Sequence, residues 1–158
     1  MKRVLFIAVL CVVSYTCSAQ KFTVKVVSIS DGDTFTAIND DNLQLKFRVY
    51  GIDAPEKRQA FGNKAKEYLS SLIFGEFVTV DVQSQDSWGR YIANVYTSKG
   101  EDVSSLMLLS GMAWHFVKFD DTPAYSSAEA KAKKGKLGLW ADKSPIAPWD
   151  FRAQSKQK

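Results

Sequence analysis

Cysteine and histidine are scarce in this chain of 158 residues. It contains two cysteines, Cys11 and Cys17, and one histidine, His115. Both cysteines lie within the first 19 residues, so the rest of the chain offers no thiolate for nucleophilic or metal chemistry. A single histidine excludes a catalytic histidine pair and a histidine-rich zinc cluster. We expect His115 to pack or to hydrogen-bond near Trp114.

Long apolar runs are also missing, with one exception at the N-terminus. Val4–Val13 is apolar throughout, follows two basic residues and precedes Cys17-Ser18-Ala19, which offers small residues where signal peptidase requires them. A run of ten is too short for a membrane-spanning helix, which needs about 20 residues. The pattern predicts a signal peptide over residues 1–19, and hence a secreted protein, periplasmic or extracellular, with no membrane association after cleavage. A buried N-terminal element and lipid modification of Cys17 are the alternatives, although the residues before Cys17 fit a lipobox poorly.

The chain has no strong excess of charge. Its formal net charge of +4 falls to +2 when the leader is removed with Lys2 and Arg3. A charge this small does not by itself indicate a nucleic-acid-binding protein. Without disulfides, the exported domain depends on its core alone, and about 139 residues can bury roughly two-thirds of their unfolded surface. We expect one domain over residues 20–141 and a C-terminal tail over residues 142–158.

Alternating apolar and polar residues predict a domain rich in strands. The strands are expected at 22–29, 34–38, 43–52, 77–82 and 91–96. Helical spacing from Asn63, with Gly75 as a stop, predicts a helix between the third and fourth strands. Asp102 is expected to begin a second, short helix and Thr122-Pro123 a third. This order suits an α+β fold, a five-stranded Greek-key barrel of the OB type with about three helices.

Charged side chains gather in three segments at the turns and ends of these strands. Asp31-Gly32-Asp33-Thr34 puts two carboxylates in a tight turn, and Asp86-Ser87-Trp88-Gly89-Arg90 puts an arginine and an aromatic residue in another. Each of these two patterns alone is more typical of an ordinary hairpin. The segment 48–56 is more specific, because its strand carries Arg48 opposite the apolar face and delivers Asp53 and Glu56 at its end. A purely structural pairing of Arg48 with Asp53 is the alternative.

Together the three segments resemble the staphylococcal nuclease (thermonuclease) family. The resemblance covers about residues 23–141 and rests on Asp-Gly-Asp-Thr at 31–34, Phe-Arg-x-x-x-Ile-Asp-Ala-Pro-Glu at 47–56 and Trp-Gly-Arg at 88–90. Gly-Met-Ala at 111–113 and Ala-Lys-x-x-Lys-x-Gly-Leu-Trp at 132–140 extend it. The joint order and spacing make the resemblance specific. The family fold is a five-stranded OB barrel with three helices, which agrees with the strand pattern.

The resemblance implies one Ca²⁺ held by the carboxylates of Asp33 and Asp53, the main-chain carbonyl of Ala54 and several waters. An all-oxygen site with few protein ligands suits a hard cation. The family often has threonine where Ala54 stands, and a carbonyl ligand tolerates that change. Asp31 is expected beside the metal without binding it. Thr34 is expected to bond Asp33 or a metal-bound water.

Catalytic roles also follow from the resemblance. Glu56 is expected to orient or deprotonate the attacking water. Arg48 and Arg90 are expected to bind the reacting phosphate, because a guanidinium binds two phosphate oxygens at once and stays charged. Trp88 is a candidate substrate contact near the phosphate. The candidate base-stacking residues are Trp114, Phe116, Phe119 and Tyr125, and we expect at least two of them to pack in the core instead. The last predicted helix carries Lys131, Lys133 and Lys134, which form either a solvated helix face or a surface that binds the nucleic-acid backbone.

The function implied is that of a monomeric, calcium-dependent endonuclease. It would hydrolyse DNA and RNA with little sequence specificity, prefer single-stranded or breathing segments, and leave 3′-phosphorylated products. One alternative is an OB-fold nucleic-acid-binding module that has lost catalysis, and another is a structural or adhesive domain. We favour the enzyme because all five expected acids and arginines are present: Asp33, Arg48, Asp53, Glu56 and Arg90.

Overall fold

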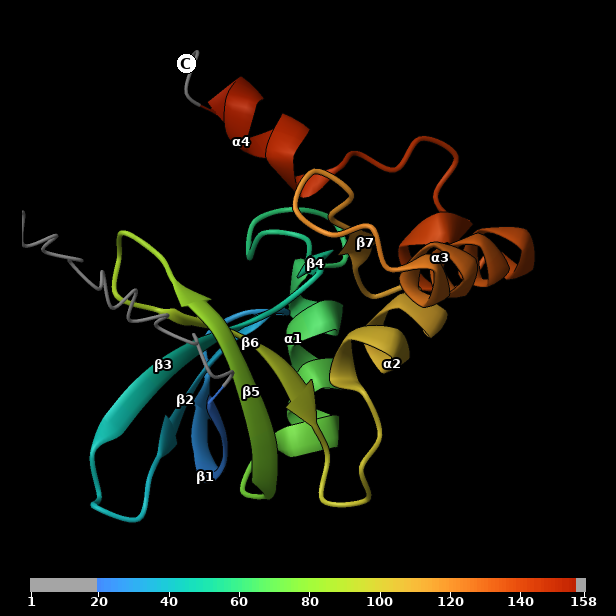
Figure 1. The fold of residues 1–158 in the computed structure, drawn as a ribbon. Coiled ribbons are helices and arrows are strands. Elements are labelled where there is room, and N and C mark those ends of the chain that lie inside the picture. Colours follow the sequence, from blue (N-terminus) through green and yellow to red (C-terminus); the bar gives the residue numbers. More distant parts are fainter. Residues whose placement is uncertain (1–19, 156–158) are drawn as a thin grey trace, which may run out of the picture.

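The structure, a computed structural model that describes residues 20–155, contains a closed barrel of five strands (Figure 1). These are β1 (Gln20–Ile29), β2 (Thr34–Ile38), β3 (Gln44–Val49), β5 (Phe77–Gln85) and β6 (Tyr91–Tyr96). The strand order is β1-β2-β3-β6-β5, and β1 pairs with β5 to close the barrel. The pairs are antiparallel except β3 with β6, which is parallel. The expected OB-type barrel is confirmed. The predicted signal peptide lies outside the described residues.

The helices lie at different places around the barrel. They are α1 (Gly62–Ile73), α2 (Val103–Leu109), α3 (Pro123–Gly135), the 3₁₀ turn η1 (Gly138–Ala141) and α4 (Pro148–Ser155). A second, two-stranded sheet pairs β4 (Ile52–Asp53) with β7 (Trp114–His115). Figure 1 shows α1 against the barrel, α2 and α3 together on one side, and α4 apart from them beyond β4. The helices α1, α2 and α3 are the three that the sequence predicted.

The core forms because the inward positions of the strands are apolar. Phe35 of β2 and Phe47 of β3 are fully buried, and their rings stack at 5.3 Å. Helix α1 adds Ala65, Leu69 and Ile73, each with no exposed surface. A large buried side chain stabilises the fold by about 1.5–3 kcal/mol. The same alternation directs Arg48, between Phe47 and the buried Val49, away from the core and toward the surface.

Two glycines bring the polar segments together. A Cβ on Gly32 would lie 2.7 Å from the Cβ atoms of both Ala54 and Ala65, so the turn at 31–34 packs directly on these two residues. Gly51 has a φ of 76°, a conformation that favours glycine. Its turn divides the single strand expected at 43–52 into β3 and β4, so the predicted strand was too long at its end. The break redirects the chain, so that Asp53 leaves the barrel wall and pairs in the small sheet.

The segment after residue 141 contains a helix that the sequence did not predict. We expected a polar, proline-containing tail there, whereas residues 148–155 form α4. Only Pro148 of this helix is buried, so there is no apolar stripe from which a helix could be read. Among the residues that the structure describes, no helix has the length and apolar character needed to cross a bilayer.

Candidate active site

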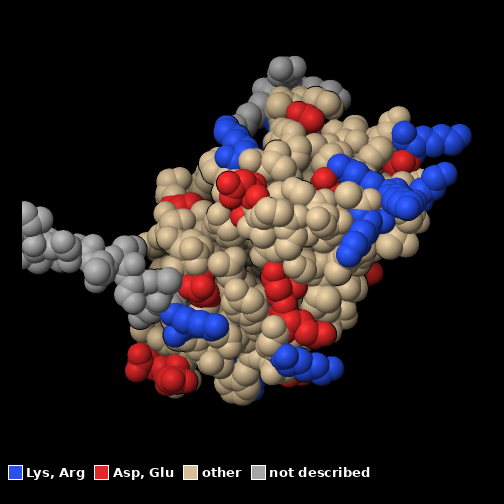
Figure 2. Space-filling model, turned by 45° about the vertical axis from the view of Figure 1, so that its right-hand side comes forward, with Lys and Arg blue, Asp and Glu red and all other residues tan. Residues whose placement is uncertain are grey.

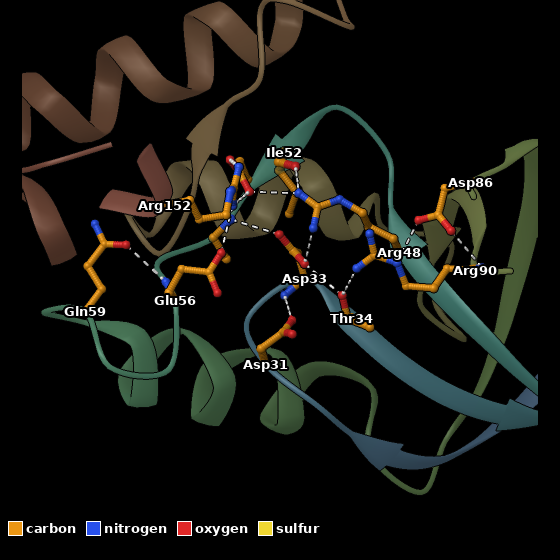
Figure 3. Close-up of polar contacts among 12 residues, drawn as sticks. Asp31, Asp33, Thr34, Arg48, Ile52, Glu56, Gln59, Asp86, Arg90 and Arg152 are labelled. Carbon is orange, nitrogen blue, oxygen red and sulfur yellow. Dashed lines mark hydrogen bonds and ion pairs between the residues drawn. The ribbon is translucent and has the colours of Figure 1, made fainter. Parts of the chain in front are cut away.

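Arg48 joins the two aspartates on which the metal prediction depends. The β2–β3 register pairs it with Thr34, which places it beside Asp33. Its Nη1 donates to Asp33 Oδ1 at 3.0 Å and its Nη2 to Asp53 Oδ1 at 2.8 Å (Figure 3). The side chain of Arg48 is 16% exposed, and although burial alone would lower its pKa, the two aspartates raise it. Arg48 therefore does pair with Asp53, and it pairs with Asp33 at the same time, so that its guanidinium links the two carboxylates.

Asp33 is buried and hydrogen-bonded through both carboxylate oxygens. Besides Arg48, its Oδ1 accepts from the Thr34 hydroxyl at 2.9 Å, and its Oδ2 accepts from the Ala54 amide at 3.0 Å. Asp31 accepts from the Asp33 amide at 3.1 Å and so steadies the turn. Burial raises the pKa of Asp33, while Arg48 acts in the opposite direction. Asp33, Ala54 and Asp31 thus lie in one cluster.

Arg152 is a residue of this cluster that sequence reasoning missed. From α4, its Nη2 donates to Asp53 Oδ2 at 2.7 Å, and its Nη1 donates to Asp53 Oδ1 at 3.1 Å and Glu56 Oε1 at 2.7 Å. Asp53 is fully buried, and the guanidiniums of Arg48 and Arg152 balance its negative charge. The hydrogen bond with Asp53 raises the pKa of Arg152, and that with Glu56 adds to the effect. The family resemblance ends near residue 141, and no motif marks this arginine.

Glu56 lies at the open end of the cluster. Its side chain is 39% exposed, far more than that of either aspartate. Its amide donates to Gln59 Oε1 at 3.1 Å, and Gln59 Nε2 donates to the carbonyl of Ile146 at 2.6 Å. The loop that carries Glu56 is thereby tied to the segment that leads into α4. An exposed carboxylate beside two buried ones is accessible to water and to a substrate.

Arg90 lies at the other end of the row, on the far side of Arg48 from Glu56 (Figure 3). Its Nε donates to Asp86 Oδ2 at 2.7 Å, while Asp86 Oδ1 accepts from the amides of Arg90 and Trp88. Burial alone would raise the pKa of Asp86, but the hydrogen bonds from Arg90 lower it. The Arg90 guanidinium lies 5.4 Å from the ring of Trp88, which is 80% exposed. Asp86 thus orients Arg90 and fixes the hairpin turn.

One cleft of 580 Å³ connects these groups. Among the residues that line it are Arg48, Glu56, Arg90 and Arg152, together with the aromatic Trp88, Phe116 and Phe119. Three guanidiniums on one concave surface favour an anionic ligand, and aromatic rings beside them favour planar groups. Figure 2 shows a group of Lys and Arg side chains at the upper right of the visible face, whereas Asp and Glu side chains are more frequent below it.

Of the four candidate base-stacking residues, two face the cleft and two pack inside. Phe116 and Phe119 line the cleft, with their ring centroids 4.8 Å apart. Tyr125 is buried, and the half-buried Trp114 packs its ring edge-on against Trp140 at 4.4 Å. The division agrees with the expectation that at least two of the four pack in the interior.

His115 of β7 and Lys133 of α3 form hydrogen bonds with neighbouring side chains outside the cleft. His115 is buried, with its Nε2 2.6 Å from Asp120 Oδ2 and its Nδ1 3.1 Å from the Ser126 hydroxyl. Lys133 donates to Glu129 at 2.7 Å. These contacts fix the loop before α3 and the end of that helix. Neither His115 nor Lys133 lines the cleft.

The donor chemistry of the cluster fits a hard cation. Within residues 20–155, no group of three or more aspartate, glutamate, histidine or cysteine side chains is arranged to hold a metal ion. The expected site needs only two carboxylates, from Asp33 and Asp53, since a carbonyl and waters complete it. Arg48 engages the Oδ1 atoms of both, and Asp33 Oδ2 accepts from the Ala54 amide. In Asp53, the second oxygen, Oδ2, accepts a hydrogen bond from Arg152.

The barrel and the cleft define a class: an OB-fold domain whose cleft is lined by arginines that are ion-paired with aspartates. The family model described as "Staphylococcal nuclease homologue" matches residues 46–142. The chain belongs to the staphylococcal nuclease family, as its motifs predicted.

Three relatives illustrate the family. An "Uncharacterized endonuclease" of Haemophilus influenzae is 41% identical over 140 residues, which cover 89% of this chain and 78% of that protein. An "Uncharacterized endonuclease" of Escherichia coli is 34% identical over 128 residues, 81% of this chain and 83% of that protein. A staphylococcal-like nuclease of Arabidopsis thaliana is 34% identical over 116 residues. The match covers 72% of this chain but only 36% of the plant protein, which is much longer.

Proposed function

We propose that this chain is a calcium-dependent endonuclease that hydrolyses DNA and RNA with little sequence specificity. Its place in the family makes it a phosphodiester hydrolase. The finer proposal is supported by one observation above all: Arg48, Arg90 and Glu56 line the same cleft, and Arg48 bridges the buried Asp33 and Asp53. This arrangement puts phosphate-binding donors, a water-accessible carboxylate and a cation-attracting pair within one site.

Each group has a distinct task in the proposed reaction. Asp33 and Asp53, with the Ala54 carbonyl, would hold Ca²⁺, which neutralises charge on the non-bridging phosphate oxygens. Arg48 and Arg90 bind the reacting phosphate from the cleft wall and stabilise the charge that develops in the transition state. Glu56 accepts a hydrogen bond from the attacking water and takes its proton at a carboxylate oxygen as the water oxygen bonds to phosphorus. The P–O5′ bond breaks, and the leaving O5′ takes a proton from solvent. Asp86 keeps the Arg90 guanidinium turned toward the phosphate.

Substrate binding in this proposal depends on stacking. Trp88, Phe116 and Phe119 offer rings along the cleft to bases that are not paired, and such stacking contributes about 1–3 kcal/mol per base. Stacking does not distinguish one base from another, which supports low sequence specificity and a preference for single-stranded or breathing segments. The proposal includes monomeric action, 3′-phosphorylated products and export through the leader at residues 1–19.

Metal dependence is the first test, with the protein expressed from Gln20. Digestion of single-stranded DNA and of RNA is expected in Ca²⁺ and is expected to stop when a chelator is added. Mg²⁺ should support much slower digestion, because the smaller ion demands stricter octahedral geometry than two carboxylates and waters provide. Electrophoresis of labelled oligonucleotides measures both rates.

The outcomes separate the parts of the proposal. Equal digestion in Ca²⁺ and Mg²⁺ contradicts the calcium assignment but not the nuclease. Oligonucleotide binding without any digestion contradicts the nuclease and supports an OB-fold binding module without catalysis. The observation in favour of that second candidate is the contact of Arg152 with both Asp53 and Glu56.

The Asp86→Asn substitution tests whether Arg90 depends on its partner. We expect kcat/KM to fall about 10-fold or more, because hydrogen bonds to charged groups contribute about 1.5–3 kcal/mol each and the neutral amide cannot form the ion pair. Steady-state hydrolysis of a single-stranded oligonucleotide measures the change. Asp40→Asn, which removes an exposed carboxylate in the turn after β2, is the matched control. Equal rates for the two variants would show that Arg90 is positioned without Asp86.

A further inference from the structure

We propose that Arg152 is a built-in competitor of the metal. In the closed arrangement, α4 rests on the site with the Arg152 guanidinium between Asp53 and Glu56, and cation binding displaces Arg152 and releases the helix. The inference rests on the proposed calcium site at Asp33 and Asp53. It makes α4 an inhibitory segment whose release is coupled to metal binding.

The competition is for specific atoms. Arg48 engages Oδ1 of both aspartates and Asp33 Oδ2 accepts from the Ala54 amide, so Asp53 Oδ2 is the oxygen for which Arg152 and a metal would compete. Asp53 Oδ2 accepts from Arg152 Nη2 at 2.7 Å, which is the contact that a metal would replace. Calcium binds its ligand oxygens at about 2.3–2.6 Å, closer than a hydrogen-bond donor, so Arg152 would have to leave Asp53 Oδ2 before a metal could bind that oxygen. A metal bound at Asp53 Oδ2 would need the position from which Arg152 Nη2 donates, and its positive charge would also repel the guanidinium at that short distance.

Arg152 also occupies the group that acts on water. Its Nη1 donates to Glu56 Oε1 at 2.7 Å, and this ion pair occupies one oxygen of the carboxylate that we assign to the attacking water. Arg152 lines the same cleft as Arg48 and Arg90, so its side chain stands where a phosphate would approach. A single arginine thus covers a metal ligand and the proposed general base at once.

Helix α4 is held lightly enough to be released. Of its eight residues only Pro148 is buried, while Trp149 and Phe151 are half-buried. The ring of Trp149 stacks on Phe116 at 5.4 Å and 7° and packs edge-on against Trp114 at 5.6 Å, and the Gln59–Ile146 hydrogen bond holds the segment just before the helix. The Arg152 side chain is 38% exposed, so solvent already reaches the ion pairs. Segments with few buried contacts open at low free energy.

Coupling of this kind is reciprocal. If Arg152 favours the closed state, the apparent calcium affinity falls in proportion to the fraction of molecules that are open. Calcium must in turn favour the open state by the same factor. Release would also free Phe116 from Trp149, and so expose one ring of the cleft for a base. The enzyme would stay covered at low calcium and open where calcium is abundant.

The first measurement is calcium binding by calorimetry to the wild-type chain from Gln20 and to Arg152→Gln. We expect the variant to bind calcium about 5-fold more tightly or better, in the usual range of coupling between sites. Arg58→Gln is the matched control: Arg58 is exposed in the loop after Glu56 and does not line the cleft. Its affinity should equal that of the wild type.

Hydrogen exchange of the α4 amides, followed by mass spectrometry, gives a readout that does not depend on activity and that can be made on the wild type alone. Calcium is expected to raise exchange over residues 148–155 in the wild type, and Arg152→Gln should show that raised exchange without calcium. Equal calcium affinity in both proteins, or α4 exchange that calcium leaves unchanged, overturns the inference while the calcium site stands. Absence of calcium binding in both proteins overturns the calcium proposal and this inference with it.

Discussion

Replacing Glu56 by glutamine is expected to slow hydrolysis of DNA and RNA by about 10²- to 10⁴-fold, the usual contribution of a general base. Glutamine keeps the size of the side chain but cannot accept the proton of the attacking water. Because Glu56 is 39% exposed and contacts Arg152 at the surface of the cluster, we expect the thermal transition to change little. Single-turnover rates at saturating Ca²⁺ measure the chemical step directly.

The control for this variant is Glu67→Gln, which removes an exposed carboxylate from α1, outside the cleft. It should leave the rate unchanged. If Glu56→Gln also hydrolyses at the wild-type rate, Glu56 is not the base, and the assignment of the water-activating group has to move elsewhere. A fall in rate together with a lost thermal transition would instead indicate damage to the fold.

Arg48→Ala is expected to have two large effects. It removes a phosphate donor, which should lower turnover by about 10²- to 10³-fold. It also removes the guanidinium shared by the buried Asp33 and Asp53, and breaking a buried pair costs about 3–5 kcal/mol of stability. Measuring kcat with thermal unfolding separates the two effects. Arg48→Lys retains the charge, but a single ammonium lacks the fork that reaches both carboxylates, so turnover should stay low while stability partly recovers.

Arg58→Ala serves as the control because it removes an exposed arginine from the loop beyond Glu56. Wild-type activity in Arg48→Ala would contradict the site assignment outright. Lost stability with retained turnover per folded molecule would mean that Arg48 is only a structural counter-ion of the two aspartates. These measurements therefore test whether Arg48 and Asp53 form only a structural ion pair, the alternative that the sequence left open.

The barrel was predictable because its information is local. Period-two alternation marks β2 and β3, and helical spacing followed by a glycine marks α1. The division of β3 from β4 was missed because the apolar residues Tyr50 and Ile52 flank Gly51 and suggest a continuous strand, whereas the positive φ of Gly51 breaks it. The pattern describes side-chain faces and says little about where a backbone turns.

The candidate site was predictable only where motifs exist. The acids and arginines at 31–34, 48–56 and 86–90 follow from the family resemblance. Arg152 could not be found this way, because its partners lie almost a hundred residues earlier and its helix has no apolar stripe. Contacts of this kind depend on the assembled fold, and a polar segment carries no local signal of them. The partnership of Asp86 with Arg90 lies within one hairpin and was within reach of sequence reasoning.

The parallel pairing of β3 with β6 joins residues 47–49 to residues 91–93 and brings the Arg48 and Arg90 strands together. This contact is distant in sequence, so its formation requires closure of the long loop between the two strands. Arg48 and Arg90 are neighbours only in molecules in which β3 and β6 have paired. A chain folded only as far as the strands β1, β2 and β3 would therefore lack the phosphate-binding pair.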